Sequence, residues 1–191
     1  MRLTDRNIDC FIEYARYGRV VAFDTETTGM GRFDEICQIA AVEYVKGETG
    51  RTFAAYLRPT CEMNPGAEAV HGLSLDFLEL QGAEPADVMA RFFDFLLDGE
   101  ALLVAHNIRF DLRMVRLECG KFGIPGLAAK LKTCDTVALA RVLRPGLASY
   151  RLGRLLEALS VPGCNSHDAL DDARACGSLF FHLIGSVPVL L

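Results

Sequence analysis

The 191-residue sequence has no apolar run long enough to cross a membrane and no segment typical of a secretory signal. Its longest apolar stretches are far shorter than the ~20 residues of a transmembrane helix. The first ten residues, MRLTDRNIDC, contain acids and no apolar central region. Hydrophobic residues make up 51% and charged residues 24% of the chain, which excludes low-complexity disorder. We therefore expect a soluble, cytoplasmic protein with no membrane partner.

The sequence also has no disulfide framework and no strongly basic character. Its seven cysteines are scattered, odd in number and never spaced as CxxC, so we expect free thiols in a reducing compartment. Twenty basic and 25 acidic residues give a formal net charge of −5. This charge disfavours a protein that coats nucleic acid through bulk electrostatics. A polyanionic substrate then requires a positive group, such as a metal ion, at the site.

No internal repeat and no Ser/Gly-rich linker divides the chain, so we expect residues 1–191 to form a single domain. Short apolar runs predict strands over residues 19–24, 36–44, 52–57, 101–105 and 132–135. Amphipathic periods predict helices over residues 4–17, 86–97, 108–122, 136–143, 150–159 and 169–184. The segment PTCEMNPG reads as a loop. This order predicts an α/β domain with a mixed sheet and helices on both faces.

Two acids stand at the end of the first predicted strand, in the motif DTETTG. Asp24 and Glu26 are two residues apart, so both side chains point to the same face of a strand. Two adjacent carboxylates repel each other unless a cation or a shared proton relieves them. For this motif taken alone, an acidic strand end that frays into a turn is an open alternative.

The motif HNIRFD places another acid in the first turn of a helix. Asp111 lies on the stripe that continues with Met114 and Val115, which we expect to be buried. Taken alone, this acid has an alternative role, because a carboxylate near a helix start complements the helix dipole by ~0.3–1 kcal/mol.

The motif HDALDDARA offers three acids, and helical periodicity selects among them. Asp172 shares an apolar stripe with Ala169 and Cys176, whereas Asp171 faces solvent. Asp168 stands near the helix start, where an acid is favourable for capping alone. We therefore select Asp172. His167 reaches the same site only if it lies on the loop before the helix.

Four acids thus recur at the ends of elements that an α/β sheet can bring together: Asp24, Glu26, Asp111 and Asp172. An oxygen-rich set of ligands suits Mg²⁺ or Mn²⁺ and disfavours zinc. Two such ions about 3.5–4 Å apart would hold the attacking and leaving oxygens of a phosphoryl transfer. A neutral imidazole at His167 would take the proton from the attacking water. The chemistry predicted from these residues is metal-assisted phosphodiester hydrolysis.

The motifs FDTETTG, HNIRFD and HDALDDA have the order and spacing of those in the DEDDh (DnaQ-like) 3′→5′ exonucleases, the family of the proofreading epsilon subunit of bacterial DNA polymerase III. The resemblance covers Val20 to about Leu183. It implies a ribonuclease H-like fold with a central five-stranded mixed sheet. It also implies that the four acids hold two divalent ions, Mg²⁺ or Mn²⁺, and that His167 is the general base.

The resemblance further implies a set of contacts to the terminal nucleotide: Thr25, Thr27, Thr28, Gly29, Met30, His71, Asn107 and Phe110. Met30 follows the glycine, where an apolar side chain can stack on or wedge between bases. Ordinary core packing is the alternative for Met30 and Phe110. Candidate contacts to a nucleic-acid backbone, with solvated helix faces as the alternative, are Arg109, Arg113, Lys130, Lys132, Arg151 and Arg154.

We therefore expect an exonuclease that releases nucleoside 5′-monophosphates from the 3′ end of single-stranded DNA, in proofreading or repair. A DNA polymerase is a candidate partner, although no clamp-binding peptide is visible in the sequence. Two alternatives stay open: a relative that trims the 3′ ends of RNA, and a nucleic-acid-binding module without catalysis. The presence of all four acids and the histidine disfavours the second alternative.

Overall fold

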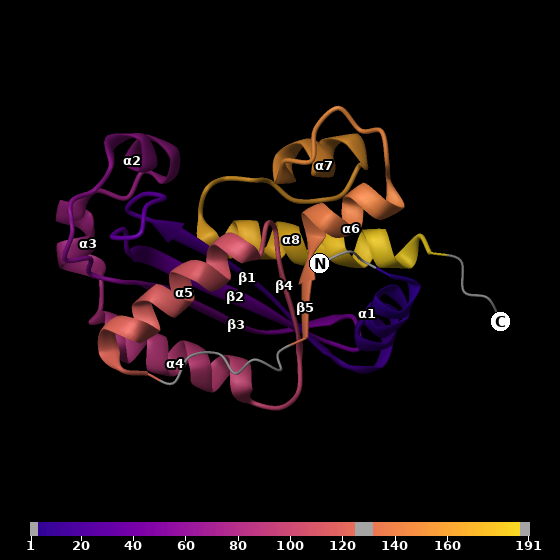
Figure 1. The fold of residues 1–191 in the computed structure, drawn as a ribbon, viewed down its shortest axis with the longest axis horizontal. Coiled ribbons are helices and arrows are strands. Elements are labelled where there is room, and N and C mark those ends of the chain that lie inside the picture. Colours follow the sequence, from indigo (N-terminus) through magenta and orange to yellow (C-terminus); the bar gives the residue numbers. More distant parts are fainter. Residues whose placement is uncertain (1–3, 125–131, 188–191) are drawn as a thin grey trace.

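The computed structural model describes residues 4–124 and 132–187. Its centre is a five-stranded sheet with the strand order β3-β2-β1-β4-β5 (Figure 1). The strands are β1 (Arg19–Thr27), β2 (Ile36–Val45), β3 (Glu48–Tyr56), β4 (Leu102–Ala105) and β5 (Lys132–Asp135). β1, β2 and β3 pair antiparallel, and β1, β4 and β5 pair parallel. The predicted mixed sheet is therefore confirmed.

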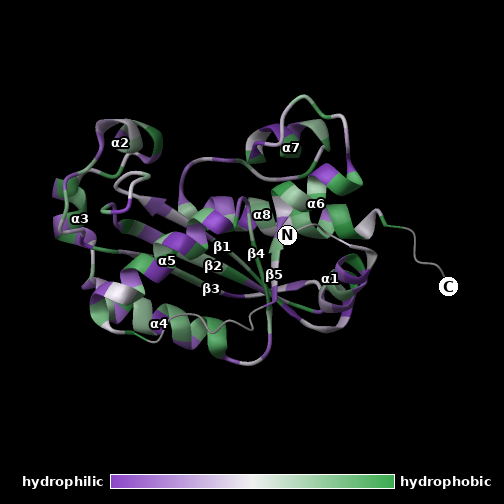
Figure 2. Ribbon diagram, in the orientation of Figure 1, coloured by the Kyte–Doolittle hydropathy of each residue, from purple (hydrophilic) through white to green (hydrophobic). Residues whose placement is uncertain are grey.

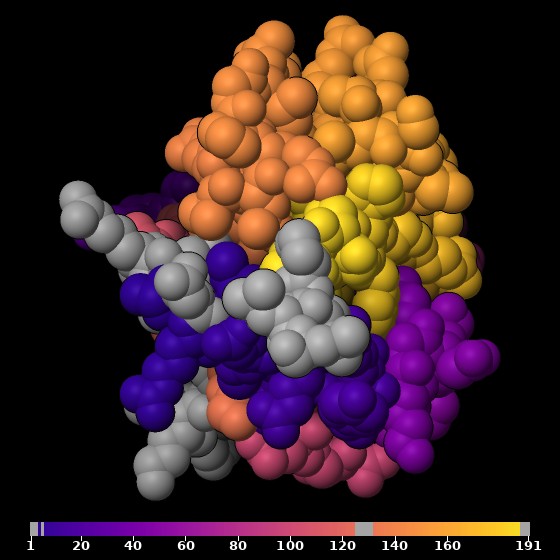
Figure 3. All heavy atoms as spheres, turned by 90° about the vertical axis from the view of Figure 1, so that its right-hand side faces the viewer, coloured from indigo at the N-terminus to yellow at the C-terminus, as the bar shows by residue number. Residues whose placement is uncertain are grey.

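Helices cover both faces of this sheet. On one face lie α1 (Asp5–Tyr17), α6 (Thr136–Leu143), α7 (Leu152–Ala158) and α8 (Ala169–Gly185). Figure 3 shows α8, in yellow, between α1 on one side and α6 and α7 on the other. The opposite face is covered by α4 (Pro85–Leu97) and α5 (Arg109–Phe122). Hydrophobic residues concentrate along the central strands and on α4 and α6 (Figure 2).

The alternation of side chains along β1 determines which helix each residue meets. Ala22 packs in the core beneath α8, and Phe23 packs in the core beneath α4 and α5. By the same alternation, Asp24 and Glu26 continue the row of Ala22 toward α8, while Thr25 continues the row of Phe23 toward α5. β1 extends three residues beyond the predicted strand, so these residues are part of the sheet.

Two short helices after β3 were not predicted: α2 (Pro65–His71) and α3 (Leu75–Gln81). The expectation of a loop through PTCEMNPG is wrong for its last two residues, which begin α2. The Asn64 side chain caps α2 by accepting from the Gly66 amide at 2.8 Å, and Ser74 caps α3. α2 has no buried residue and α3 has only Leu78. Seven-residue helices with so few core positions show no apolar periodicity in the sequence. Their capping residues are the only signal that the sequence offers for them.

All seven cysteines are free, as expected. Four of them are buried, namely Cys37, Cys119, Cys134 and Cys176, and Cys164 is exposed. Within residues 4–124 and 132–187, no helix combines the length and the hydropathy that crossing a bilayer requires.

A close approach between α8 and β2 provides a test of the packing. A Cβ added at the buried Gly177 would lie 2.4 Å from the Tyr44 hydroxyl, and the Tyr44 ring is itself held 5.0 Å from that of Phe181. We expect Gly177→Ala to destabilise the fold by about 1–3 kcal/mol through overpacking, which lowers the melting temperature by roughly 2–4 °C per kcal/mol.

Gly120→Ala is the matched control, because Gly120 is an exposed residue of α5 with no atom near an added Cβ. It should be neutral or stabilise the fold by up to about 1 kcal/mol through helix propensity. Calorimetry of both variants measures the two effects. Equal melting temperatures for them would contradict the tight contact between α8 and β2.

Candidate active site

Four acidic side chains converge at the carboxyl end of β1. Asp24 and Glu26 lie on β1 itself, Asp111 lies in the first turn of α5, and Asp172 lies in the first turn of α8. Asp111 and Asp172 are only 3% and 5% exposed, as the apolar stripes of their helices predicted. The sheet thus brings together acids that are up to 148 residues apart in the sequence.

The acids form two adjacent groups. Glu26 and Asp172 lie with His167 in a cluster, in which each residue offers one ligand atom and these atoms lie within 4.8 Å of one another. Among the described residues, no other set of three acidic, histidine or cysteine side chains meets this spacing. Asp24 lies near both Asp111 and the cluster, since the charges of Asp111, Glu26 and Asp172 all raise its pKa.

Burial and mutual repulsion make these carboxyl groups weak acids. Burial raises the pKa of Glu26 to about 8, and the charges of Asp172 and Asp111 contribute further. Burial also raises the pKa of Asp111 to about 7, although the Thr25 hydroxyl donates a hydrogen bond to it at 2.8 Å and opposes the rise. The pKa of Asp24 is raised well above its ordinary value, first by burial and then by its acidic neighbours.

No positive side chain offsets this charge. Over residues 4–124 and 132–187, no lysine or arginine forms an ion pair with any of the four acids. Buried like charges persist only if a cation or protons relieve them. Carboxylate oxygens are the ligands that hard divalent cations prefer. The donor set therefore fits Mg²⁺ or Mn²⁺.

The loop before α8 positions both His167 and the carboxylate of Asp172. The Ser166 amide donates to Oδ1 of Asp172 at 2.9 Å, and the Asn165 side-chain amide donates to Oδ2 at 3.0 Å. The same Asn165 nitrogen lies 3.3 Å from Nδ1 and 3.4 Å from Nε2 of the His167 ring. His167 is exposed and adopts a left-handed backbone conformation with φ of 58°. It lies on the loop, which is the placement that lets it join Asp172.

The other two acids of the motif HDALDDARA, Asp168 and Asp171, have the predicted structural roles. Asp168 caps α8, because its Oδ1 accepts from the amides of Leu170 at 3.0 Å and Asp171 at 3.2 Å. The Asp171 side chain is 46% exposed and pairs with Arg174. Neither residue belongs to the cluster of ligand atoms.

Sequence reasoning missed Gln38, which fixes the start of α8 to the sheet. This residue lies opposite Glu26 on β2. Its side-chain amide donates to Oδ2 of Asp168 at 2.8 Å, and its oxygen accepts from the Ala169 amide at 3.0 Å. The signal in the sequence was a polar residue inside the apolar run ICQIAAV. Sequence reasoning also did not select Asn165.

The threonines of the first motif use their hydroxyl groups inside the protein. Thr27 donates to the Gly29 carbonyl at 2.6 Å, and Thr28 accepts from the Glu35 amide at 3.0 Å. A Cβ added at Gly29 would lie 2.7 Å from the Asp34 carboxylate. These two hydroxyl groups are thus bound within the protein, and the backbone of both residues is the part that the resemblance places against the nucleotide.

Met30 is 80% exposed, so the core-packing alternative for this residue is wrong. Phe33, which sequence reasoning did not select, is also exposed. Arg113 holds this loop by donating to the carbonyls of Met30 at 2.9 Å and Gly31 at 3.2 Å. Phe110 is partly buried against the core beneath α5, so both readings of Phe110 stay open.

His71, at the end of α2, contacts the end of β1. Its Nδ1 accepts from the Leu73 amide at 3.0 Å, so its Nε2–H donates to the Thr27 carbonyl at 3.2 Å. Burial lowers the pKa of His71, and His167 adds to this effect. His71 therefore reaches the site through the backbone of Thr27.

A cleft of about 1060 Å³ is lined by His167 of the cluster and by Asn165, which binds Asp172, but by none of the four acids. Met30 and Asn107 also line it, and Arg151 and Arg154 line it along α7. The candidate backbone contact Lys132 lies elsewhere, since it binds Glu100 and the Tyr14 hydroxyl at 3.0 and 2.9 Å. Lys130 lies outside the described residues.

Buried carboxylates at the end of the central strand, beside a cleft with arginine walls, define a hydrolase site for a polyanion. A family model described as "Exonuclease" matches residues 21–180. The chain therefore belongs to this exonuclease family, as the motifs predicted.

Relatives in this family include two proteins of bacteria. The 3′-5′ exonuclease DinG of Bacillus subtilis is 36% identical over 171 residues, which cover 87% of this chain and 18% of DinG. The DNA polymerase III subunit epsilon of Salmonella typhimurium is 34% identical over 178 residues, which cover 87% of this chain and 72% of epsilon. This chain thus spans less than a fifth of DinG.

The fold is also shared with solved exonucleases. E. coli Exonuclease I, in complex with a dA16 oligonucleotide, matches with a TM-score of 0.75 and 24% identity. The match covers 84% of this chain and 39% of that chain. The ribonuclease H-like fold implied by the sequence is therefore confirmed.

The raised pKa values predict how the metal-free protein responds to pH. Between about pH 4.5 and 8 the folded state keeps protons on Glu26 and Asp111 that the unfolded chain releases, so the free energy of unfolding falls as pH rises. We expect the melting temperature without metal to decrease from about pH 5.5 to 8.5. Added Mg²⁺ or Mn²⁺ should raise it most at the higher pH.

Glu26→Gln removes one of these charges and should melt higher than the unchanged protein at about pH 8.5 without metal. Glu157→Gln is the control, because the Glu157 side chain is 71% exposed and pairs only with Arg154. Differential scanning calorimetry across the pH series measures both. A melting temperature that rises with pH in the absence of metal would contradict the repulsion among the buried acids.

Proposed function

We propose that this protein is a 3′→5′ exonuclease that releases nucleoside 5′-monophosphates from the 3′ end of single-stranded DNA. The observation that carries the proposal is the convergence of four carboxylates, two of them buried and two half-buried, and an imidazole beside an arginine-lined cleft. Membership of the exonuclease family supports phosphodiester hydrolysis. DNA is supported by one relative that is a DNA polymerase III subunit and by a structural neighbour that binds dA16.

Asp24, Glu26, Asp111 and Asp172 are the proposed ligands of two divalent ions, Mg²⁺ or Mn²⁺. Two ions are proposed from the resemblance of these motifs to those of the DEDDh exonucleases. When bound, the ions supply positive charge that stabilises the charge developing on the scissile phosphate and the leaving oxygen. The hydrogen bonds from Thr25 to Asp111 and from Asn165 to Asp172 orient these carboxylates and leave their charge in place.

His167 is the proposed general base. Its ring lies within 4.8 Å of the ligand atoms of Glu26 and Asp172 and is open to the cleft, where water can enter. A neutral imidazole there accepts the proton of the attacking water and passes it to solvent, since the side chain is exposed. The amide of Asn165, which contacts both Asp172 and the ring, holds His167 beside the acids.

The terminal nucleotide is proposed to lie between the end of β1 and α5. The backbone at Thr25, Thr27, Thr28 and Gly29 forms one wall, which His71 holds through the Thr27 carbonyl. Asn107 and Phe110 form the other wall, and the exposed Met30 stacks on the base. Arg151 and Arg154 contact the strand farther along the cleft.

We also propose that residues 1–191 work as one exonuclease domain in the cytoplasm, in proofreading or repair. The relation to an epsilon subunit supports a DNA polymerase as partner, and co-purification with a polymerase would test that association.

Digestion of labelled oligonucleotides tests the activity directly. With Mg²⁺ or Mn²⁺, 3′-labelled single-stranded DNA should release labelled mononucleotide at once, while 5′-labelled DNA should shorten stepwise. EDTA, Asp24→Asn and Asp172→Asn should each abolish hydrolysis, because each removes a cation or one of its ligands. Asp171→Asn is the matched control and should keep full activity, since Asp171 pairs with Arg174 outside the cluster.

The same assay distinguishes the alternatives. Faster digestion of matched RNA would make the protein an exoribonuclease of the same family. Binding of DNA without any release of nucleotide would make it a non-catalytic module. Full turnover in EDTA would refute the metal mechanism.

His167→Ala should slow hydrolysis by ~10²–10⁴-fold, the usual contribution of a general base, while metal binding is retained. Isothermal titration with Mn²⁺ measures binding, and single-turnover digestion measures the rate. His182→Ala, on the exposed side of α8, is the control. Unchanged turnover in His167→Ala would remove this residue from the role of base.

A further inference from the structure

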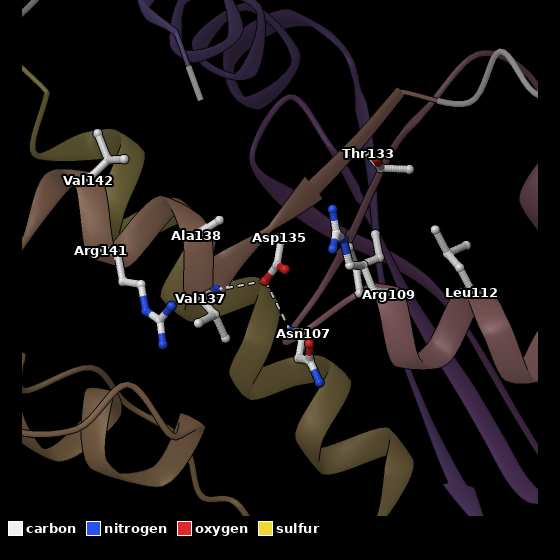
Figure 4. Close-up of a pocket in the computed structure, with 10 residues that line it drawn as sticks. Asn107, Arg109, Leu112, Thr133, Asp135, Val137, Ala138, Arg141 and Val142 are labelled. Carbon is white, nitrogen blue, oxygen red and sulfur yellow. Dashed lines mark hydrogen bonds between the residues drawn. The ribbon is translucent and has the colours of Figure 1, made fainter. Parts of the chain in front are cut away.

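A second pocket, of about 680 Å³, lies between the start of α5 and α6 beside the edge strand β5 (Figure 4). Ten residues line it: Asn107, Ile108, Arg109, Leu112, Thr133, Asp135, Val137, Ala138, Arg141 and Val142. None of the four acids or His167 is among them. The pocket therefore lies outside the cluster of the acids and His167.

The lining combines an apolar surface with two free positive charges. Ile108, Leu112 and Val137 supply apolar surface, while Arg109 and Arg141 lie on opposite sides of the pocket (Figure 4). Both arginines are exposed, and neither forms a hydrogen bond or ion pair with any described residue, while the Arg141 guanidinium lies over the Tyr150 ring at 5.4 Å from its centre. Two unpaired guanidinium groups flanking an apolar surface match a base with its neighbouring phosphates.

Asp135 makes the pocket unsuitable for a free inorganic anion. Its Oδ1 accepts from the amides of Asn107 at 3.1 Å and Val137 at 3.0 Å (Figure 4). Its Oδ2 has no hydrogen-bond partner among the described residues. A carboxylate between the two arginines repels a bare phosphate, whereas its free oxygen can accept from the amino or imino group of a base.

The second pocket is continuous with the cleft of the active site. Asn107, Val137 and Arg141 line both. Asn107 adopts a left-handed conformation with φ of 69°, and its side chain has no hydrogen bond within the described residues. The cleft also reaches His167, so a strand with its 3′ end at His167 can pass along the cleft and enter the second pocket.

We propose that the pocket between α5 and α6 is a nucleotide subsite for the substrate strand, upstream of its 3′ end. The base lies on the apolar surface beside Asp135, and Arg109 and Arg141 bind the flanking phosphates. This inference rests on the proposed function, because that function places the 3′ end at His167. The subsite gives the enzyme a preference for single strands long enough to reach it.

The test compares substrates that do and do not reach the pocket. The probes are the p-nitrophenyl ester of thymidine 5′-monophosphate and oligothymidylates of increasing length. The variant is Arg109→Ala with Arg141→Ala, and the control is Arg6→Ala with Arg16→Ala, which removes two exposed charges on α1. We expect the first pair to raise KM for long strands about tenfold, as for one lost base or phosphate contact. Its kinetics on the ester should match the unchanged protein.

A single abasic nucleotide moved along a long strand identifies the base contact. In the unchanged protein, an abasic nucleotide at one upstream position should raise KM. In the arginine variant, an abasic nucleotide at the same position should not raise KM further. The subsite would be refuted if the arginine variant raised KM equally for the ester and for long strands, or if it did not raise KM for long strands. An increase in KM for long strands that is as large in the control variant as in the arginine variant would also refute the subsite.

Failure of the proposed function gives a different result, because the unchanged protein would then hydrolyse neither the ester nor the strands. The subsite is tested in that case by fluorescence anisotropy with a labelled oligothymidylate in the Asp24→Asn background, which needs no turnover. The arginine pair should weaken binding of long strands about tenfold and leave that of a dinucleotide unchanged. Equal affinity for long strands with and without the arginine substitutions would refute the proposal.

Discussion

Repulsion among buried carboxylates is the constraint on which the rest of this structure depends. Glu43, one strand away on β2, shows how the fold treats an ordinary buried acid: Arg51 and Arg19 bind it and hold its pKa at about 2. Glu26 has no such partner, and burial raises its pKa to about 8. Among the described residues, two arginines thus bind Glu43, whereas none binds Glu26 or the three acids beside it. In the proposed function, a bound divalent cation would offset this repulsion.

The alternation of a single strand joins the two faces of the sheet at this site. Asp24 and Glu26 point toward α8, which carries Asp172, while Thr25 between them points toward α5 and donates to Asp111. Two helices on opposite faces thus meet around three consecutive residues of β1. The apolar residues earlier in β1 pack on both faces and hold the strand in register, because a slip of one residue would turn both acids to the wrong face.

Much of this site could be predicted from the sequence, because buried acids on apolar stripes are unusual. The stripes through Asp111 and Asp172 marked these two acids, and the position of Asp168 at a helix start marked it as a cap. What could not be predicted depends on contacts between distant residues. Gln38 reaches Asp168 across 130 residues, and Arg113 reaches the Met30 loop across 83. Helices α2 and α3 were missed for a different reason, since they bury almost nothing and periodicity reports only burial.

The net charge of −5 gives little information about how this protein meets a polyanion, because the charges differ in their surroundings. Many surface charges are paired with each other, as Arg51 is with Asp98. Arg109 and Arg141, beside the cleft, have no such partner among the described residues, and in the proposed function a cation would offset the acids at its end. A strand would then be attracted along one path, while repulsion over the rest of the surface would oppose its adsorption elsewhere. Such a charge distribution suits the proposed hydrolysis at one strand end.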